Sequence, residues 1–573
     1  MRRLRTILNV LAAANVAVAA WDVATGGIYF TAFGVVFSSW ELAKPLRYAA
    51  VCAALSMVLR DRATPGRSWE ILGAWAGRLA ATVAILSALV AARFAVTAAG
   101  SADAYGYVSQ AKLWLDRSLI VPDPLAPLRP QLGLAAAPVG YTLAADGPGL
   151  VPVYPPGLSL LMAAARWLRG PQAVYAVVPL LAGIAVWMTF LVAERTAGAR
   201  AAAAATILLA SNPLFLFQSF QPMSDVPVTA WWTAAWAMSL APGSWAAFVA
   251  GVSAAAAIIT RPNLAPLVLV VAAVIVAMPP RWRRIAYFAA PVAVACAVVL
   301  AFNHLLYGSS FMTGYGPPRS LFALSNARAN LAAYFTWTRD LFTPLIFLGF
   351  AAPLIVRRSA VAWMIVFSIG VLASYVFYMV FDSWPFERFL LPAAPLLYAA
   401  TMAIVVRAIE RLPLSVRPVT LFSIVTLLLV HHAGVAQRLH IFDTQTAEQR
   451  YADVGRYIEC LPAEAVVFAT VHSGSVRMYG DRLTVRWDAL PPDGLDRAVA
   501  ALRDAGYAPY FLLEGWEEPL FRRHFAGSEL GRIDWPPMLE YPYFSHTRVY
   551  RVDDRARHFS GEPIETRPIP PGS

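Results

Sequence analysis

Charged residues are scarce in this sequence. Asp, Glu, Lys and Arg make up 14% of the 573 residues, whereas 59% are hydrophobic. A soluble globular domain carries roughly 25% charged residues, so this composition indicates a membrane protein. The net charge of +12 would suggest a nucleic-acid partner in a soluble protein. Here much of the arginine lies in short loops between apolar runs, as membrane orientation requires, and we expect no nucleic-acid partner.

Cysteine and the common cofactor motifs are scarce as well. Cys52 and Cys296 lie in apolar segments and Cys460 lies in the polar C-terminal part, which leaves no disulfide framework and no CxxC metal pair. The sequence contains no HExxH, P-loop or GxGxxG motif in a supporting context, so nothing supports nucleotide chemistry.

The apolar residues gather in runs that are long enough to cross a bilayer. About 20 apolar residues span the hydrocarbon core, so we predict a multi-pass α-helical membrane protein with about 13 transmembrane helices. The predicted spans are residues 5–21, 45–60, 75–99, 172–193, 199–217, 226–241, 244–260, 262–278, 285–305, 341–356, 360–381, 389–406 and 419–436.

Three apolar pieces need a separate interpretation. Residues 26–45 form a broken run that we expect to lie on the surface. Residues 158–168 are too short to span and end in Arg-Trp-Leu-Arg, which predicts an interfacial helix. The N-terminal run fits a cleaved signal peptide or an uncleaved first helix, and both place Trp21 outside.

Arginine determines the predicted orientation. With these spans, six arginine-bearing loops fall on one side, which the positive-inside rule assigns to the cytoplasm. We therefore expect a bacterial inner-membrane protein whose C-terminal part lies in the periplasm. The six loops contain Arg2, Arg3 and Arg5; Arg60, Arg62 and Arg67; Arg195 and Arg200; Arg281, Arg283 and Arg284; Arg357 and Arg358; and Arg407, Arg411 and Arg417.

The chain divides into two predicted domains. Residues 1–440 form the transmembrane domain. In residues 441–573, apolar strand-like runs alternate with helix-like runs, which predicts a small soluble α/β domain. The proline-rich end, residues 562–573, is expected to be disordered.

One hydrophilic stretch, residues 100–157, interrupts the apolar pattern. Long loops without their own periodicity are usually functional or disordered, so we interpret this stretch as an active-site loop on the outer face. The turns and loops at 218–227, 307–340 and 382–388 are expected on the same face. The loop carries Asp103, Asp116, Asp123 and Asp146, with Tyr105, Tyr107, Gln110 and Tyr154.

Two of the outer carboxylates have two interpretations each. Asp103 could act as a general base towards an acceptor hydroxyl, or it could cap the helix that follows, since Asp is a favoured N-cap residue. Asp225 precedes a helix that starts near Pro227, which favours capping. It would lie at the same face as Asp103, so a role as second acid or ligand for a substrate hydroxyl stays open.

Two outer arginines suit a phosphate. Arg261 stands at a membrane boundary just before Pro262, where the guanidinium and a helix N-terminus both attract anions. Arg388 lies in a similar turn, with Glu387 beside it as an ion-pair candidate. The alternative for both is an arginine that snorkels to the interface.

Taken together, these segments resemble the membrane-embedded glycosyltransferases of the GT-C fold. The likeness is greatest to the bacterial branch related to protein O-mannosyltransferases and the lipid A aminoarabinose transferase. It covers roughly residues 70–440 and rests on an ordered set of segments. These are Asp103-Ala-Tyr-Gly-Tyr107 with Gln110, Tyr154–Leu158, Ala193–Gly198 with Ser224–Pro227, Arg261-Pro262, Asn303–Tyr315 and Arg388–Pro392.

The resemblance implies a reaction and a set of site residues. Such enzymes transfer a sugar from a polyprenyl-phosphate carrier to an acceptor on the non-cytoplasmic face, with inversion at the anomeric carbon. It implies that Asp103 is the base and that Arg261 and Arg388 stabilise the leaving lipid phosphate. Protein O-mannosyltransferases usually carry an Asp-Glu pair in this loop, whereas Ala104 follows Asp103 here. The residues expected to bind substrate are Tyr105, Tyr107, Gln110, Tyr154, Asp225, Arg261, Tyr315 and Arg388.

Neither the metal nor the acceptor is defined by the sequence. Some relatives bind a divalent metal, but Asp116, Asp225 and His304 form no clear ligand set, and we predict none. The acceptor could be a lipid, a glycan or a protein.

Two other classes remain open. A transporter or lipid flippase would also need polar residues at membrane depth, but the carboxylates cluster in outer loops. A non-catalytic membrane scaffold that displays the C-terminal domain would need Asp103 only for folding.

Overall fold

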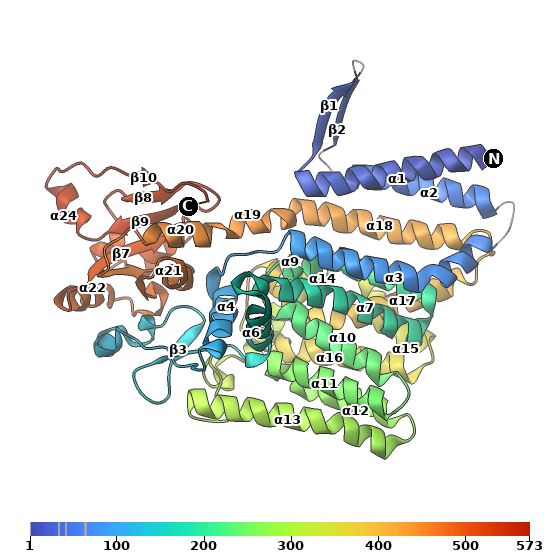
Figure 1. The fold of residues 1–573 in the computed structure, drawn as a ribbon, viewed down its shortest axis with the longest axis horizontal. Helices are drawn as coiled ribbons and strands as arrows, with labels where there is room; N and C mark the ends of the chain where they lie inside the picture. Colours follow the sequence, from blue (N-terminus) through green and yellow to red (C-terminus); the bar gives the residue numbers. More distant parts are fainter. Residues whose placement is uncertain (1, 33–34, 40–42, 62–65, 573) are drawn as a thin grey trace.

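The structure is a computed structural model that describes residues 2–32, 35–39, 43–61 and 66–572. Long helices lie side by side in a bundle, and a separate α/β unit stands at one end of it (Figure 1). The bundle helices are α1 (Arg2–Thr25), α2 (Ala43–Asp61), α3 (Arg67–Arg93), α7 (Val177–Ala197), α8 (Ala199–Ser211), α9 (Pro213–Ser219), α10 (Asp225–Ser239), α11 (Ser244–Thr260), α12 (Val268–Val276), α13 (Arg281–Tyr307), α14 (Ala327–Phe342), α15 (Ala352–Ile355), α16 (Ser359–Val376), α17 (Ala394–Ile409) and α18 (Arg417–Arg438).

The bundle confirms a multi-pass helical membrane protein but not 13 spans. Seven helices of the described residues are long and apolar enough to cross a membrane, or up to nine if each bent pair counts as one span. Of the other predicted spans, 45–60 falls on α2, which has 19 residues but several charged side chains, and the rest are helical but short. For example, α10 has 15 residues, or about 22 Å at 1.5 Å per residue, against a hydrocarbon core of about 30 Å.

One predicted boundary near the N-terminus is wrong, and one segment gains a structure that was not predicted. The span predicted at 75–99 is a helix from Arg67 to Arg93, and the chain then runs on without regular structure to Gly100. Part of the segment 26–45, expected as an apolar surface piece, forms a hairpin of β1 (Ile28–Ala32) and β2 (Val35–Ser39). Residues 33–34 and 40–42 of that segment lie outside the described residues.

Small side chains bring the central helices close together. The alanines at positions 201–205 of α8 are at most 3% exposed. At Gly183 of α7, a Cβ atom would stand 2.9 Å from the backbone oxygen of Ala84 in α3. Membrane helices associate through such contacts because lipid tails provide no hydrophobic driving force between them.

The loop 100–157 contains regular structure. It begins with α4 (Ser101–Leu115), includes an antiparallel pair of β3 (Tyr141–Leu143) and β4 (Leu150–Pro152), and leads into α6 (Pro156–Arg169). The helix predicted at 158–168 is therefore present. It buries Leu158 and Met162 and exposes Trp167 and Leu168. Its position at the membrane interface stays a prediction.

The C-terminal part is the α/β domain that the sequence predicts. Its six-stranded sheet has the order β10-β8-β9-β7-β5-β6. The strands β6, β5 and β7 are parallel, and β9 runs antiparallel to β7 and β8. The strands are β5 (Ala465–Phe468), β6 (Leu483–Val485), β7 (Ala508–Leu513), β8 (Leu539–Tyr541), β9 (Thr547–Arg551) and β10 (Arg567–Pro568), and the helices are α19 (Thr444–Glu448), α20 (Arg450–Ile458), α21 (Ser473–Tyr479), α22 (Leu495–Asp504), α23 (Glu518–His524) and α24 (Asp554–Phe559).

The prediction of a disordered end is wrong for the described residues. Arg567 and Pro568 pair in parallel with β8, Ile569 is fully buried, and the Gly572 N–H donates to the Asp453 carboxylate at 3.0 Å. Proline is tolerated because β10 is an edge strand.

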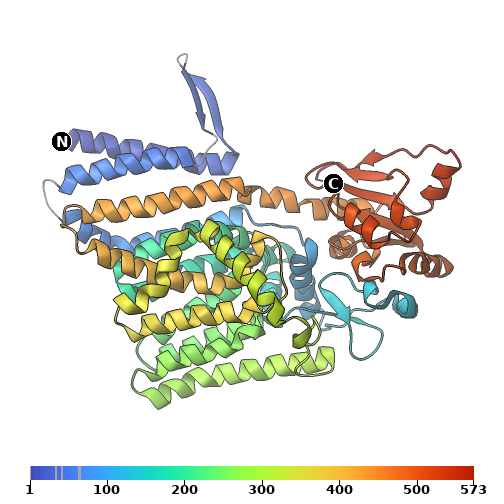
Figure 2. The same cartoon turned by 180° about the vertical axis from the view of Figure 1, so that it is seen from behind.

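The α/β domain and the loop share a hydrophobic core. Leu125, Leu132 and Ala136 pack in the same cluster as Phe468 and Phe511 of the sheet. Both views show the segment between α4 and α6, in cyan, lying against the domain (Figures 1 and 2). The loop therefore joins the membrane bundle to the C-terminal domain.

Candidate active site

The helix α4 places Asp103 in its first turn. Gly100 is the N-cap residue, and the helix has no side-chain capping hydrogen bond. Asp103 therefore does not cap α4 by hydrogen bonding, although a carboxylate in the first turn is favoured by the helix dipole. Its side chain is 23% exposed, so solvent or a substrate can reach it.

Two side chains hold the Asp103 carboxylate. The Tyr154 hydroxyl donates to Oδ1 at 2.6 Å, and the Arg388 guanidinium pairs with Oδ2 at 2.8 Å. Burial raises the pKa of the Tyr154 hydroxyl well above its usual value, and the charge of Asp103 raises it further. Tyr154 therefore stays protonated as a donor.

A second ion pair lies beside the first. Asp225 accepts from Arg261 at 2.7 Å and stands 4.0 Å from Arg388. Arg261 also donates to the Ser224 hydroxyl at 3.1 Å. Ser224 is the N-cap residue of α10, without a side-chain capping bond, so the expectation that Asp225 caps this helix is wrong.

Charges of opposite sign thus alternate in the order Asp103, Arg388, Asp225, Arg261. We call these four residues the charge chain. Arg261 Nη1 and Arg388 Nε are buried with no hydrogen-bond partner in the described part of the chain. The arginines therefore retain donors for a further anion. Glu387 accepts from Thr338 instead, so its expected pairing with Arg388 is wrong.

Aromatic rings pack around part of the charge chain. The ring of Tyr154 contacts the ring of Tyr107, at 4.5 Å between centroids, and the ring of Tyr315, at 5.9 Å. Phe389 lies 5.4 Å from the guanidinium of Arg388 and 5.7 Å from that of Arg261. Rings at this distance attract cations through their π faces.

Six of the eight predicted substrate-binding residues lie at the charge chain or the rings around it, and two do not. Gln110 is fully buried, and its amide donates to the backbone oxygen of Tyr154 at 3.3 Å. Tyr105 packs on Tyr141, with centroids 5.6 Å apart, and faces the α/β domain at Gly474. Gln110 and Tyr105 therefore contact residues next to the site and not the charge chain itself. Their predicted contact with substrate is untested.

Sequence reasoning missed several neighbours of the charge chain. Met223 Sδ lies 3.2 Å from Arg388 Nη1, and Tyr375 stacks on Phe389 at 4.9 Å. The Tyr375 hydroxyl reaches Asn263 at 3.5 Å. Asn263 stands two residues after Arg261 and Phe389 directly follows Arg388, so their closeness in the sequence to the two arginines could have predicted that they lie at the site. Tyr375 gave no such signal.

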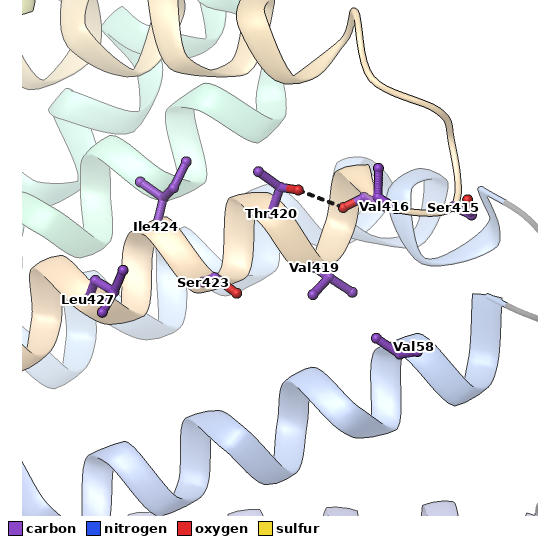
Figure 3. Close-up of a pocket in the computed structure, with 8 residues that line it drawn as sticks. All are labelled: Val58, Ser415, Val416, Val419, Thr420, Ser423, Ile424 and Leu427. Atoms are coloured by element: carbon purple, nitrogen blue, oxygen red, sulfur yellow. Dashed lines mark hydrogen bonds between the residues drawn. The ribbon is translucent and has the colours of Figure 1, made fainter.

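No ligand set for a metal is evident among the described residues, where no group of three or more His, Cys, Asp or Glu side chains could hold an ion. A separate groove of about 470 Å³ lies between α2 and the start of α18. Figure 3 shows Val58 facing Val419 and Ser423 across it. It has no charged lining residue and lies at the far end of α18 from the α/β domain, so it is not part of this site.

Comparison with known proteins identifies the fold. No protein-family model matches the chain, and no curated protein matches it. The crystal structure of ArnT from Cupriavidus metallidurans bound to undecaprenyl phosphate matches with a TM-score of 0.52 and 12% identity, over 83% of this chain and 97% of that one. ArnT in the apo state gives a TM-score of 0.49 at 12% identity, over 83% and 97% of the two chains. The Archaeoglobus fulgidus oligosaccharyltransferase gives 0.48 at 13% identity, over 77% of this chain and 70% of that one.

These proteins are GT-C fold membrane glycosyltransferases. At such low identity the likeness to ArnT establishes the fold, and the predicted GT-C fold is confirmed.

Proposed function

We propose that this protein is an inverting glycosyltransferase that moves a sugar from a polyprenyl-phosphate carrier to an acceptor hydroxyl on the outer face of a bacterial inner membrane. The charge chain carries this proposal. A partly exposed carboxylate stands beside two guanidiniums with spare donors, and the reaction needs one base and one anion-stabilising group. The GT-C fold and the undecaprenyl phosphate bound to ArnT support it.

Asp103 is the proposed catalytic base. It accepts the proton of the acceptor hydroxyl while that oxygen forms a bond to the anomeric carbon. The bond from the anomeric carbon to the phosphate oxygen breaks at the same time, and its electron pair leaves with the lipid phosphate. A single displacement of this kind inverts the anomeric carbon.

Arg388 and Arg261 are the proposed partners of the phosphate. The leaving group gains a negative charge, which preorganised cations stabilise more in a site shielded from water. Since Arg388 pairs with Asp103, a donor phosphate that binds Arg388 would compete with the carboxylate and leave it available to the acceptor. Asp225 is buried and holds Arg261, so it orients the cations.

The proposed partners follow from this chemistry. They are a polyprenyl-phosphate hexose or pentose as donor, a lipid, glycan or protein hydroxyl as acceptor, and the surrounding membrane lipid. The α/β domain is proposed to lie in the periplasm. The exposed ring of Tyr315 offers a surface on which a sugar can pack.

Transfer of labelled sugar from a panel of polyprenyl-phosphate sugars tests the proposal. The wild type is compared with D103N, which keeps the size of the side chain but removes the base. D116N is the matched control, because Asp116 ends the same helix and is exposed. We expect transfer by the wild type and D116N and a loss of at least 100-fold in D103N.

Each outcome is decisive. Full transfer by a folded D103N protein would remove Asp103 as base. No transfer by the wild type from any donor, with acceptor membranes present, would overturn the proposed function.

A further inference from the structure

The sheet of the α/β domain has a topological switch point. The parallel strands have the order β6-β5-β7. The chain therefore passes from β5 to β6 on one side of β5 and then crosses to β7 on the other side of β5. In open α/β sheets, ligands bind in the crevice at the carboxyl ends of the strands where this reversal occurs. In this domain the crevice lies between the segments that follow Phe468 and Leu513.

The crevice is filled by the chain itself. His472, after β5, and Glu514, after β7, are almost completely buried and lie 3.0 Å apart at Nε2 and Oε1. Arg450 of α20 donates to Glu514 at 2.8 Å. Tyr451 packs on the imidazole of His472, with 4.6 Å between centroids, and its ring lies 4.3 Å from the Arg450 guanidinium. Tyr451 is thereby held in one orientation.

Tyr451 contacts the start of the helix that carries Asp103. A Cβ atom at Gly100 would stand 2.1 Å from the Tyr451 ring, closer than any real contact. Gly100 has φ −94° and ψ 164°, a conformation that alanine adopts without strain. Glycine is therefore required here by the ring and not by the backbone.

The segment before α4 is held by further hydrogen bonds from the same domain. The Ala99 N–H donates to the Tyr479 hydroxyl at 2.8 Å. Gln445 donates to the Ala95 oxygen at 2.7 Å. The same segment is also bound to the bundle, because the Val96 N–H donates to the backbone oxygen of Phe220 at 2.7 Å. The segment 94–100 is thus clamped between the bundle and the α/β domain.

The first residue of α4 adopts an uncommon conformation. Ser101 has φ 53°, a region that non-glycine residues rarely occupy and keep only where their surroundings impose it. Two positions later comes Asp103. Further along α4, Tyr105 packs on Gly474, where a Cβ atom would stand 2.3 Å from the ring. The α/β domain therefore contacts α4 on both sides of Asp103.

We propose that the α/β domain positions the catalytic base, with Tyr451 and Tyr479 as positioning residues. In other α/β domains this crevice would bind a ligand. Here its residues contact the segment that leads into α4. These contacts fix the position of α4 and therefore the distance from the Asp103 carboxylate to the acceptor. This inference rests on the proposed function. A misplacement of about 1 Å can lower a rate about 100-fold, so loss of these contacts lowers kcat while the arginines keep the affinity for the donor.

Four variants of the full-length protein test it. Y479F removes only the hydroxyl that accepts the Ala99 N–H, and we expect kcat to fall roughly 2- to 10-fold. G100A places a methyl group against the Tyr451 ring, and we expect a fall of about 100-fold. G100A combined with Y451L makes room for that methyl group and recovers part of the loss. Y550F is the matched control, because its buried hydroxyl bonds Glu518 inside the domain and not the bundle, and its kcat stays at the wild-type value.

The measurements are kcat and the donor KM with a labelled polyprenyl-phosphate sugar, and hydrogen exchange of peptides covering residues 94–115. We expect the donor KM to stay within about 2-fold and exchange of these peptides to increase in Y479F and G100A. Unchanged kcat in both variants, while the wild type transfers sugar, overturns the inference and leaves the proposed function intact. If the wild type transfers no sugar, the proposed function fails, and unchanged exchange in both variants then overturns the clamp as well.

Discussion

The buried pair of Asp225 and Arg261 gives the sharpest test of the site. D225N keeps the size of the side chain and one oxygen but removes the negative charge. In the native protein the charge chain contains two carboxylates and two guanidiniums, so its formal charges cancel. The substitution leaves one unbalanced positive charge where the Asp225 side chain is 2% and the Arg261 side chain 13% exposed.

The magnitude follows from this burial. Removal of one partner of a buried ion pair costs about 3–5 kcal/mol. Arg261 retains the Ser224 hydroxyl at 3.1 Å and the new amide oxygen, so we expect the lower end, about 3 kcal/mol, or roughly a hundredfold in the ratio of folded to unfolded protein. Since both arginines lose an anchor, kcat falls about 10- to 100-fold. The donor KM does not rise, because the cations remain and have one competitor fewer.

Thermal unfolding in detergent and transfer kinetics measure the two effects. D340N is the matched control, because Asp340 pairs with Arg339 at the same 2.7 Å but both side chains are at least half exposed. Exposed pairs contribute little to stability, so D340N unfolds and transfers like the wild type. A D225N protein that unfolds at the wild-type temperature and transfers sugar at the wild-type rate would refute the importance of the pair.

Two further predictions concern the α/β domain. Cys460 is its exposed cysteine, whereas Cys52 and Cys296 are partly covered within the bundle, so a membrane-impermeant maleimide added from the periplasmic side labels the wild type but not C460S. Partial desolvation raises the pKa of this thiol above its usual value of 9.0, so the thiolate fraction increases between pH 7 and pH 8.5 and labelling is faster at pH 8.5. Labelling only from the cytoplasmic side would contradict the predicted orientation. Burial also raises the pKa of Glu517 from 4.5 to about 8. The folded protein therefore holds a proton that the unfolded chain loses, and this group's contribution to stability is complete below pH 4.5 and is lost as the pH rises to 8. E517Q imitates the protonated form and removes that loss, so its unfolding temperature relative to the wild type rises between pH 5 and pH 9; a constant difference over this range would argue against a protonated Glu517.

The sequence alone determined the elements whose cause is local. Most predicted spans fall on a helix because a run of apolar residues must satisfy its backbone within the membrane, whereas 199–217 and 341–356 fall on pairs of helices bent by 60° and 108°. The α/β domain followed from alternating runs, as at residues 466–471 and 495–505. Both are properties of neighbouring residues. Where a boundary was wrong, as at Arg93, the residues that follow are apolar as well, and contacts with Phe220 and Gln445 override the pattern.

The candidate site was predicted as a set of residues but not as an arrangement. Asp103, Asp225, Arg261 and Arg388 stood out because charge is rare in such a chain and costly at the membrane. Their pairing was beyond the sequence: Glu387 was the expected partner of Arg388, and capping was the favoured role of Asp225. An adjacent or helix-capping partner can be inferred from spacing, whereas Arg388 reaches Asp103 only because α4 and the turn before α17 meet.

Only the tertiary structure shows that the C-terminal domain contacts the segment before α4, next to the candidate site. Tyr451, Tyr479 and Gly100 carry no signal in the sequence, since tyrosine and glycine are common and their contact depends on where two distant segments lie. The sequence determined which segments are apolar, which are helical and which charges are available. The packing of bundle and domain decided which charges meet, because a close contact between distant residues is a property of the folded chain and not of any stretch of it.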